Sequence, residues 1–419
     1  MKDIYLPVAE KAIEGSLKVQ QGEVILVITD QPSYAFGEAF RKAAEKMGHH
    51  VLSIITPLTE TDGAEPLKAV GEAMKNVDVA IAITRNSLTH CIAIKEARAL
   101  GVRLLSMPNV NERLFLSPAL LLNQEMMERT IRAAELFTIA RKLRVKTELG
   151  TDMTMELGGW TRPAGVDNGL IDKPGLVGNL PAGEALIAPL EHTGNGVIVA
   201  DCSASGGIGL LTDPIKLFFK NGQLVDLTGG PKAEALKLVF DQSGPGARNL
   251  AEFAIGLNAR AEIIGNILLD EKKLGTAHVG IGNSECIGGN VYSNSHIDAI
   301  FSRPTIYLDG EEISVAGNLK LGDKGFENYQ SYSGQEFSGN IKARADLAQI
   351  KGDVLYRTWR DVWGKNYLAR VGTAETNKLV CKFFQILLNT NCNLKILHEQ
   401  FGQQDKWKLL RLLRYYELV

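Results

Sequence analysis

Short apolar runs alternate with amphipathic stretches along the first 150 residues. The amphipathic stretches include AFGEAFRKAAEKMG and segments near 65–76 and 90–101, and a long helix is predicted over 118–144. The predicted strands are EVILVITD (23–30), VLSIITP (51–57), DVAIAIT (78–84) and VRLLSMP (102–108). This alternation predicts a parallel α/β sheet with helices on both faces.

Residues 151–330 have a different pattern, because Gly and Pro become frequent and the apolar runs become short. One helix-like piece, 231–242, interrupts them. The predicted strands include ALIAPL (185–190), GVIVADC (196–202), PIKLFF (214–219), TAHVGIG (276–282) and TIYLDG (305–310). Turn residues such as those of KNGQ separate the runs, which indicates a mixed, β-rich second domain.

The last stretch, residues 331–419, has 14 Lys/Arg against eight Asp/Glu and ends in the amphipathic, basic DKWKLLRLLRYYELV. A helical accessory extension or an oligomer contact is favoured over a nucleic-acid patch, because an excess of six charges over 89 residues is small. We therefore expect three parts: an α/β domain over 1–150, a metal-binding catalytic domain over 151–330 and a helical extension over 331–419.

Composition narrows the class of protein. The 419 residues carry a formal net charge of −2 and are 45% hydrophobic, which suits packed cores and gives no general attraction to nucleic acid or membranes. The five cysteines are scattered without a CxxC spacing, which is typical of a reduced, cytoplasmic protein without a zinc knuckle. The start lacks the apolar region of a signal peptide, and no run of 18 apolar residues predicts a membrane span.

The stretch SNSHIDAIF contains the first sign of chemistry. In a strand, His296, Asp298 and Ile300 share one face while Ile297, Ala299 and Phe301 share the other. A buried face does not tolerate a carboxylate without a partner. The face that carries His296 and Asp298 therefore meets water, a hydrogen-bond partner or a metal.

Three further segments place ionisable residues in apolar surroundings. They are PAGEALIAP with Glu184, NLAEFAIG with Glu252 and TAHVGIG with His278. A lone histidine or acid in such a run is usually a satisfied core residue or a strand-end cap. Four such segments together favour a metal site, because all these side chains are metal ligands and several carboxylates need cations to share a dry pocket.

Other chemistries have no support in the sequence. No GxGxxG follows the first strand, no GxxxxGK[ST] occurs, and DCSASGG lacks a GxSxG elbow. Dinucleotide binding and covalent serine catalysis are therefore not expected.

The series LPAGEALIAPLE, RNLAEFAIGLN, DEKKLGTAHVGIG and SHIDAIFSRPTIYLDGEEI resembles the M29 metallopeptidases, the aminopeptidase T/aminopeptidase S family, over residues 1–325. The resemblance implies a cytoplasmic, homodimeric aminopeptidase that hydrolyses peptides with two Zn, Co or Mn ions. The implied metal ligands are Glu184, Glu252, His278, His296 and Asp298. Glu252 or Glu285 is the implied general base that takes the proton of a metal-activated water. No nucleic acid or membrane partner is expected.

One position departs from that family. The family's tyrosine ligand lies seven residues after the first histidine, where this chain has Glu285, and Tyr292 is the nearest tyrosine. The resemblance extends to 2,5-dihydroxypyridine 5,6-dioxygenase, which implies a single Fe(II) held by His278, His296 and Asp298. The aminopeptidase is the first interpretation, the ring-cleaving dioxygenase is the alternative, and a non-catalytic metal-binding protein is the third.

Overall fold

The structure is a computed structural model that describes residues 3–321, except 61, 90, 159–161 and 163. The predicted helical extension over 331–419 lies outside the described residues. Within the described part, no helix is both long and apolar enough to cross a bilayer.

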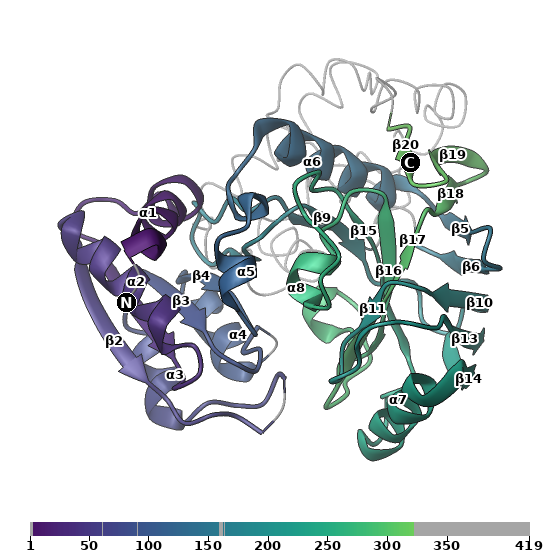
Figure 1. Cartoon of the computed structure of the whole chain (residues 1–419), viewed down its shortest axis with the longest axis horizontal. Coiled ribbons are helices and arrows are strands. Elements are labelled where there is room, and N and C mark those ends of the chain that lie inside the picture. The colour runs from purple at the N-terminus through teal and green to yellow at the C-terminus, as the bar shows by residue number, and fades with distance from the viewer. Residues whose placement is uncertain (1–2, 61, 90, 159–161, 163, 322–419) are drawn as a thin grey trace, which may run out of the picture. The chain divides into compact units, whose positions relative to one another are not determined.

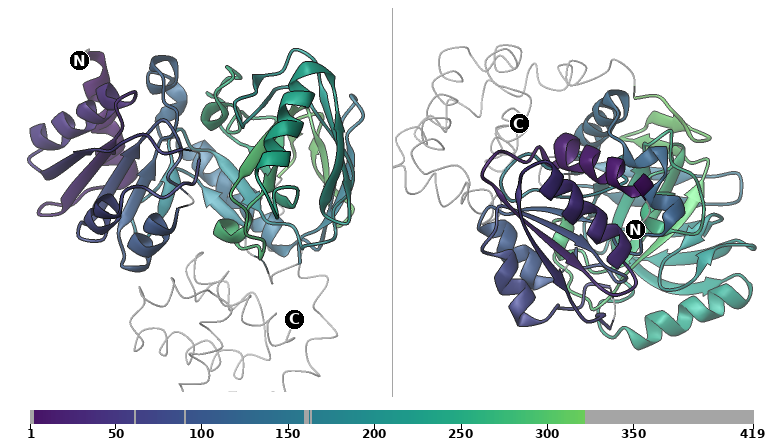
Figure 2. Two further views of the ribbon diagram at one scale, coloured as in Figure 1. Left: turned by 90° about the horizontal axis from the view of Figure 1, so that it is seen from below. Right: turned by 60° about the vertical axis from the view of Figure 1, so that its left-hand side comes forward.

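The first sheet is parallel throughout, with the order β2-β1-β3-β4-β8 (Figure 1). Its strands are β1 (Val24–Thr29), β2 (His50–Ile55), β3 (Val79–Ile83), β4 (Arg103–Ser106) and β8 (Val177–Asn179). The helical segments around it are η1 (Asp3–Tyr5), α1 (Leu6–Lys11), η2 (Ala12–Leu17), α2 (Tyr34–Lys46), α3 (Lys68–Met74) and α4 (Ile92–Ala99). Ile25 and Val27 of β1 pack with α2, while Leu26 and Ile28 pack with α3 and α4, so helices cover both faces as predicted (Figure 2).

The predicted helix over 118–144 is wrong at both ends. The chain forms α5 (Glu112–Phe115) and the 3-10 turn η3 (Pro118–Leu120), and only then α6 (Gln124–Ile139). Asn123 caps α6 by accepting a hydrogen bond from the N–H of Met126 at 3.1 Å. Residues 142–146 form a strand in which exposed and buried side chains alternate. The apolar residues there repeat at every second position, as in a strand, and not every 3.6 positions, as in a helix.

Two antiparallel sheets make up the rest of the described chain. The eight-stranded sheet contains β5 (Lys142–Lys146), β6 (Asp152–Glu156), β10 (Asn195–Ala200), β13 (Ile215–Lys220), β14 (Gln223–Thr228), β18 (Thr305–Leu308), β19 (Glu311–Val315) and β20 (Asn318–Leu319). The seven-stranded sheet contains β7 (Gly165–Asp167), β9 (Glu184–Ile187), β11 (Ser203–Ala204), β12 (Gly209–Leu210), β15 (Leu250–Gly256), β16 (Thr276–Gly282) and β17 (His296–Ser302). The remaining helical segments are α7 (Gly230–Gln242), α8 (Ile267–Asp270) and η4 (Glu285–Ile287).

One apolar core joins these two sheets. Val145 of β5 and Ile198 of β10 share it with Phe253 of β15 and Val279 of β16. Phe137 of α6 packs edge-on against Phe253, with ring centroids 5.9 Å apart. The seven-stranded sheet thus has one face in a dry core, which leaves its other face for polar residues.

Two strands pair with strands from the other side of the expected domain boundary at residue 150. β5 begins at Lys142, before the expected division at 150, and pairs with β6 and β18 of the eight-stranded sheet. β8 comes after that division but pairs with β4 of the parallel sheet. The predicted class is confirmed: a parallel α/β sheet followed by a mixed β-rich region.

Candidate metal centre

The candidate site lies on the polar face of the seven-stranded sheet, across β9, β15, β16 and β17. The register of these strands puts all five predicted metal ligands on this face: Glu184, Glu252, His278, His296 and Asp298. Their chain neighbours Phe253, Val279 and Ala299 point into the core on the other face. Because side chains alternate between the two faces of each strand, the candidate ligands lie on one face of the sheet and the apolar core residues on the other.

Gly280 makes room for one of the histidines. It lies on β16 directly between Glu252 of β15 and Asp298 of β17. A Cβ on Gly280 would lie 2.5 Å from His296 Nε2 and 2.8 Å from the Cβ of Glu252. The missing side chain is thus the space that the imidazole of His296 fills.

His296 has a defined tautomer. Its Nδ1 lies 2.7 Å from the carbonyl oxygen of Asn283, and because that oxygen only accepts, Nδ1 carries a proton. Its Nε2 faces Glu252 Oε2 at 3.1 Å and Asp298 Oδ1 at 3.3 Å. An imidazole lone pair cannot face two carboxylates without a cation or a proton between them. We call Glu252, His296 and Asp298 the outer group.

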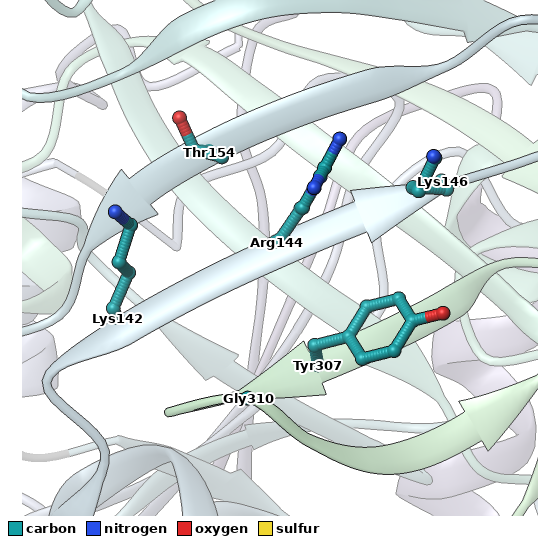
Figure 3. Close-up of a pocket in the computed structure, with 6 residues that line it drawn as sticks. All are labelled: Lys142, Arg144, Lys146, Thr154, Tyr307 and Gly310. Carbon is teal, nitrogen blue, oxygen red and sulfur yellow. The ribbon is translucent and has the colours of Figure 1, made fainter.

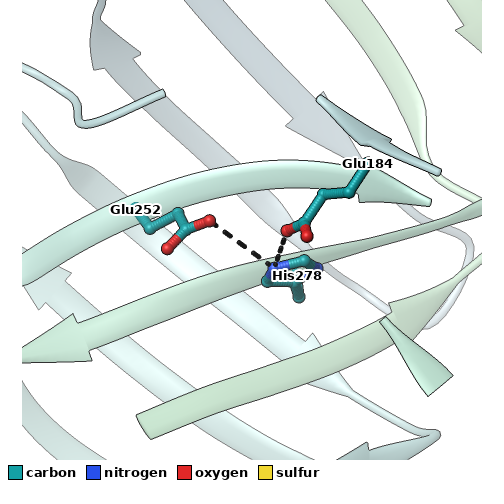
Figure 4. A group of neighbouring side chains, drawn as sticks. All are labelled: Glu184, Glu252 and His278. Carbon is teal, nitrogen blue, oxygen red and sulfur yellow. Dashed lines mark ion pairs between the residues drawn. The ribbon is translucent and has the colours of Figure 1, made fainter. Parts of the chain in front are cut away.

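A second set of ligands, the inner group, consists of Glu184, Glu252 and His278 (Figure 4). His278 Nε2 lies 2.9 Å from Glu184 Oε1 and 3.8 Å from Glu252 Oε1, and the Nδ1 of His278 has no hydrogen-bond partner in the described part of the chain. All three residues are buried. Glu252 belongs to both groups, since its Oε1 faces His278 and its Oε2 faces His296.

The carboxylates favour protonated imidazoles when no ion is bound. Burial by itself lowers the pKa of His278, but the charges of Glu184, Asp298 and Glu252 outweigh burial and raise that pKa to about 9. Burial also opposes the charge of His296, and Asp298 and Glu252 together raise its pKa well above the ordinary range. Protons and a divalent ion therefore compete for the same two nitrogen atoms.

Lys272 supplies a cation beside the inner group. Its side chain is 1% exposed, and its Nζ lies 2.7 Å from Glu271 Oε1 and 3.1 Å from Asp167 Oδ2, and also donates to Glu184 Oε2. Burial opposes the charge, but the three carboxylates raise the pKa of Lys272 well above its ordinary value. Burial also raises the pKa of Glu184, but Lys272 and His278 outweigh it and lower that pKa to about 2. We call Lys272 with Asp167, Glu184 and Glu271 the lysine cage.

The donor set fits a metal ion. Two imidazoles and three carboxylates suit Fe(II), Zn, Mn or Co. The outer group also has the supporting contact that metal-bound histidines usually have, from Nδ1 to a backbone carbonyl. The structure thus brings the five predicted ligands together in two groups of three that share Glu252.

The structure does not bring Glu285 or Tyr292 into either group. Glu285 is exposed in η4, where its backbone N–H donates to Asn283. Tyr292 is 63% exposed, and its hydroxyl donates to Asn294. The physical reason is that the chain leaves the sheet between β16 and β17, so position 285 does not share the polar face of the strands.

The lysine cage was missed by sequence reasoning. Lys272 lies in the run DEKK just before β16, and such a run of charged residues is typical of a solvated turn. Its neighbour Lys273 is half-buried and belongs to no cage. Only the unusual presence of four charges beside a buried strand could have indicated it.

A separate basic hollow lies on the eight-stranded sheet (Figure 3). It is open and is lined by Lys142, Arg144, Lys146, Thr154, Tyr307 and Gly310. Arg144 is already paired with Asp152 at 2.8 Å. The five predicted ligands do not line it, so it is distinct from the candidate site.

Two solved structures have a fold similar to that of this chain. A 2,5-dihydroxypyridine dioxygenase from Pseudomonas putida KT2440 superposes with a TM-score of 0.65 at 20% identity, covering 76% of this chain and 97% of that one. Wild-type AmpT from Thermus thermophilus superposes with a TM-score of 0.55 at 18% identity, covering 75% and 98%. The fold implied by the resemblance is confirmed, since both structures share it with this chain.

Sequence comparison is more specific. The profile of the family described as 2,5-dihydroxypyridine 5,6-dioxygenase matches residues 9–321, and the chain belongs to this family. A 2,5-dihydroxypyridine 5,6-dioxygenase from Pseudomonas putida is 27% identical over 217 residues, which cover 48% of this chain and 61% of that protein. The match therefore spans less than two thirds of the relative's length. The comparisons support the interpretation that the protein is an enzyme. The aminopeptidase interpretation is supported only by the fold that the chain shares with AmpT.

Proposed function

We propose that the protein is a non-haem Fe(II) dioxygenase that opens a hydroxylated aromatic ring of the dihydroxypyridine type. The observation that carries the proposal is the placement of His278, His296 and Asp298 on one face of β16 and β17 in a chain of this family. Two histidines and one carboxylate are the ligand set of non-haem Fe(II) oxygenases. When bound, Fe(II) supplies the redox chemistry that O₂ needs to react with an electron-rich ring.

The chain's own residues hold the ligands and handle protons. Asn283 fixes the ring of His296 through its backbone carbonyl, so Nε2 stays directed at the outer group. Glu252 lies between the two histidines, with one oxygen toward each, and is the carboxylate proposed to take a proton from a ring hydroxyl. The side chains of His296 and Asp298 are 14% and 15% exposed, whereas that of His278 is 1% exposed, so substrate approaches from the outer group.

A two-metal aminopeptidase is the second candidate. The observation in its favour is that Glu252 contributes one oxygen to each group, as a carboxylate that bridges two ions does. Peptide would then be the substrate, and a homodimer is part of the same proposal.

The two candidates differ in what they consume. Purified protein loaded anaerobically with Fe(II) is mixed with 2,5-dihydroxypyridine, and oxygen uptake is followed together with loss of ring absorbance. Zn-, Co- and Mn-loaded protein is given leucine p-nitroanilide in parallel. We expect one O₂ consumed per ring opened and no anilide hydrolysis. Anilide hydrolysis without oxygen uptake would instead support the aminopeptidase.

Two variants make the comparison site-specific. Asp298→Asn removes a ligand and is expected to abolish oxygen uptake. Glu311→Gln, the same carboxylate-to-amide change at an exposed position of β19, is expected to retain it. Equal loss in both variants would count against the site.

A further inference from the structure

The stretch DCSASGG (201–207), which lacks a nucleophile elbow, lies beside the outer group. Ala204 of β11 is opposite Ala299 of β17. The next pair along the same register joins Ser205 to Asp298, and the N–H of Ser205 donates to the carbonyl oxygen of Asp298 at 2.9 Å. Residues directly opposite each other in an antiparallel pair point to the same face of a sheet. The side chain of Ser205 therefore lies on the polar face, next to a predicted metal ligand.

The hydroxyl of Ser205 replaces a backbone carbonyl at the end of this ladder. The chain turns away after Ser205, because Gly206 and Gly207 adopt φ angles of 67° and 82°. In that turn the carbonyl oxygen of Ser205 accepts a hydrogen bond from the N–H of Ile208 at 3.4 Å. The N–H of Asp298 donates to the Oγ of Ser205 instead, at 2.7 Å. The serine side chain is thus fixed to the strand that carries the outer ligands.

This bond uses the Ser205 hydroxyl as an acceptor and leaves its proton available. A hydroxyl group can accept one hydrogen bond and donate another at the same time. Within the part of the chain that the structure describes, the Ser205 proton has no acceptor, whereas Ser302 of β17 donates its own to Asp201 at 2.6 Å. Ser205 is half-buried, and the side chain of Asp298 beside it is partly exposed. A ligand that reaches the outer group can therefore reach this hydroxyl.

We infer that Ser205 is a substrate-binding residue, whose hydroxyl donates a hydrogen bond to an oxygen of the aromatic ring bound at the outer group. This inference rests on the proposed ring-opening function and names a residue that orients the ring. A ring hydroxyl that has given its proton to Glu252 is an acceptor, which is the partner that the Ser205 proton needs. A single fixed donor favours rings with an oxygen at one particular position.

Ligand binding tests the inference without turnover. Mn²⁺-loaded protein is titrated anaerobically with 2,5-dihydroxypyridine in a calorimeter. We expect Ser205→Ala to bind the ring about 10-fold more weakly, which corresponds to the loss of one hydrogen bond. The affinity for Mn²⁺ itself should not change, because Ser205 Oγ bonds the backbone N–H of Asp298.

Two further serine variants provide the controls. Ser203→Ala makes the same change two positions earlier on β11, where the side chain is fully buried, so it should bind the ring as wild type does. Ser205→Thr keeps the hydroxyl and should retain the affinity that Ser205→Ala loses. If Ser205→Ala does not fold, Ser205→Cys replaces the hydroxyl with a weak donor, and the same weakening is expected.

Ring analogues separate a direct contact from an effect through the strand. 2-Hydroxypyridine and 3-hydroxypyridine each lack one of the two ring oxygens. The analogue without the bonded oxygen should bind equally to wild type and Ser205→Ala, while the other should keep the difference between them. An equal loss for both analogues, a loss that Ser203→Ala shares, a parallel loss of Mn²⁺ affinity, or unchanged binding of every ring would overturn the inference.

The outcome is separable from that of the proposed function. Weaker ring binding by Ser205→Ala, without oxygen uptake by the Fe(II)-loaded wild type, would keep the inference and reject the dioxygenase. Oxygen uptake by the wild type, with equal ring binding in Ser205→Ala, would do the reverse.

Discussion

The inner and outer groups lie side by side on one sheet and are built from the same residue types, yet they balance charge differently. The inner group is buried and has Lys272 as a permanent counter-ion. The outer group is partly exposed, and the Nε2 of its histidine faces two carboxylates. Similar ligands therefore do not imply similar occupancy, because the charges around them decide what each position takes up.

The largest expected effect comes from removing an outer ligand. Asp298→Asn takes away the carboxylate that faces His296 Nε2, so we expect Mn²⁺ affinity to fall by more than about 100-fold, beyond the loss seen for supporting residues. Isothermal titration calorimetry measures the affinity, and circular dichroism checks the fold. Tight binding of one ion by Asp298→Asn would place the ion at the inner group and reverse the comparison.

A smaller effect is expected from filling the space beside His296. In Gly280→Ala the new methyl group would overlap the imidazole, which must move away from Glu252 and Asp298. We expect a loss of about 1–3 kcal/mol in the free energy of unfolding and weaker metal binding. Urea denaturation and calorimetry measure the two quantities.

Gly15→Ala is the matched control for that change, since no atom lies within 4 Å of the position of its Cβ. It should leave metal affinity unchanged. Equal metal affinity in Gly280→Ala and wild type would mean that His296 does not bind the ion through the nitrogen that faces Gly280.

The pH dependence tests whether protons and metal compete. In metal-free protein, the raised pKa of His278 contributes stability that is fully present below about 6.5 and is lost as pH rises through about 9. From about 1.36 kcal/mol per unit, this amounts to about 3 kcal/mol. Metal affinity should rise over the same window, because binding must displace the protons.

The measurement is the melting temperature with saturating Mn²⁺ minus that with chelator, taken between pH 6.5 and 9. We expect this difference to grow with pH. A difference that is constant or shrinks would show that the imidazoles are not the groups that the ion deprotonates.

The smallest effect is expected at Glu285, which stands where the resembling family has its tyrosine ligand. Glu285→Gln changes an exposed side chain outside both groups, so we expect a stability change within about 0.5 kcal/mol and the same metal count. Thermal unfolding and atomic emission provide the check. Loss of metal in this variant would mean that η4 moves onto the polar face when an ion binds.

Much of the candidate site could be predicted from short-range patterns. The run SHIDAIF predicts a strand with His296 and Asp298 on one face, and the structure places Ile297 and Phe301 in the core on the other. The helix predicted over 118–144 failed because a proline turn and a switch to period two at Lys142 outweighed the apolar pattern.

The sequence by itself determined which side chains leave the core, since alternation along a strand is a local property of the backbone. Only the tertiary structure decided which of them meet. Strand order and register put Glu184, Glu252 and His278 beside the HxD strand, and a glycine in β15 lets a distant turn bury Lys272 against Glu184. Whether a charged residue lies in water or among carboxylates depends on packing between segments that are far apart in the chain, and no local pattern contains that information.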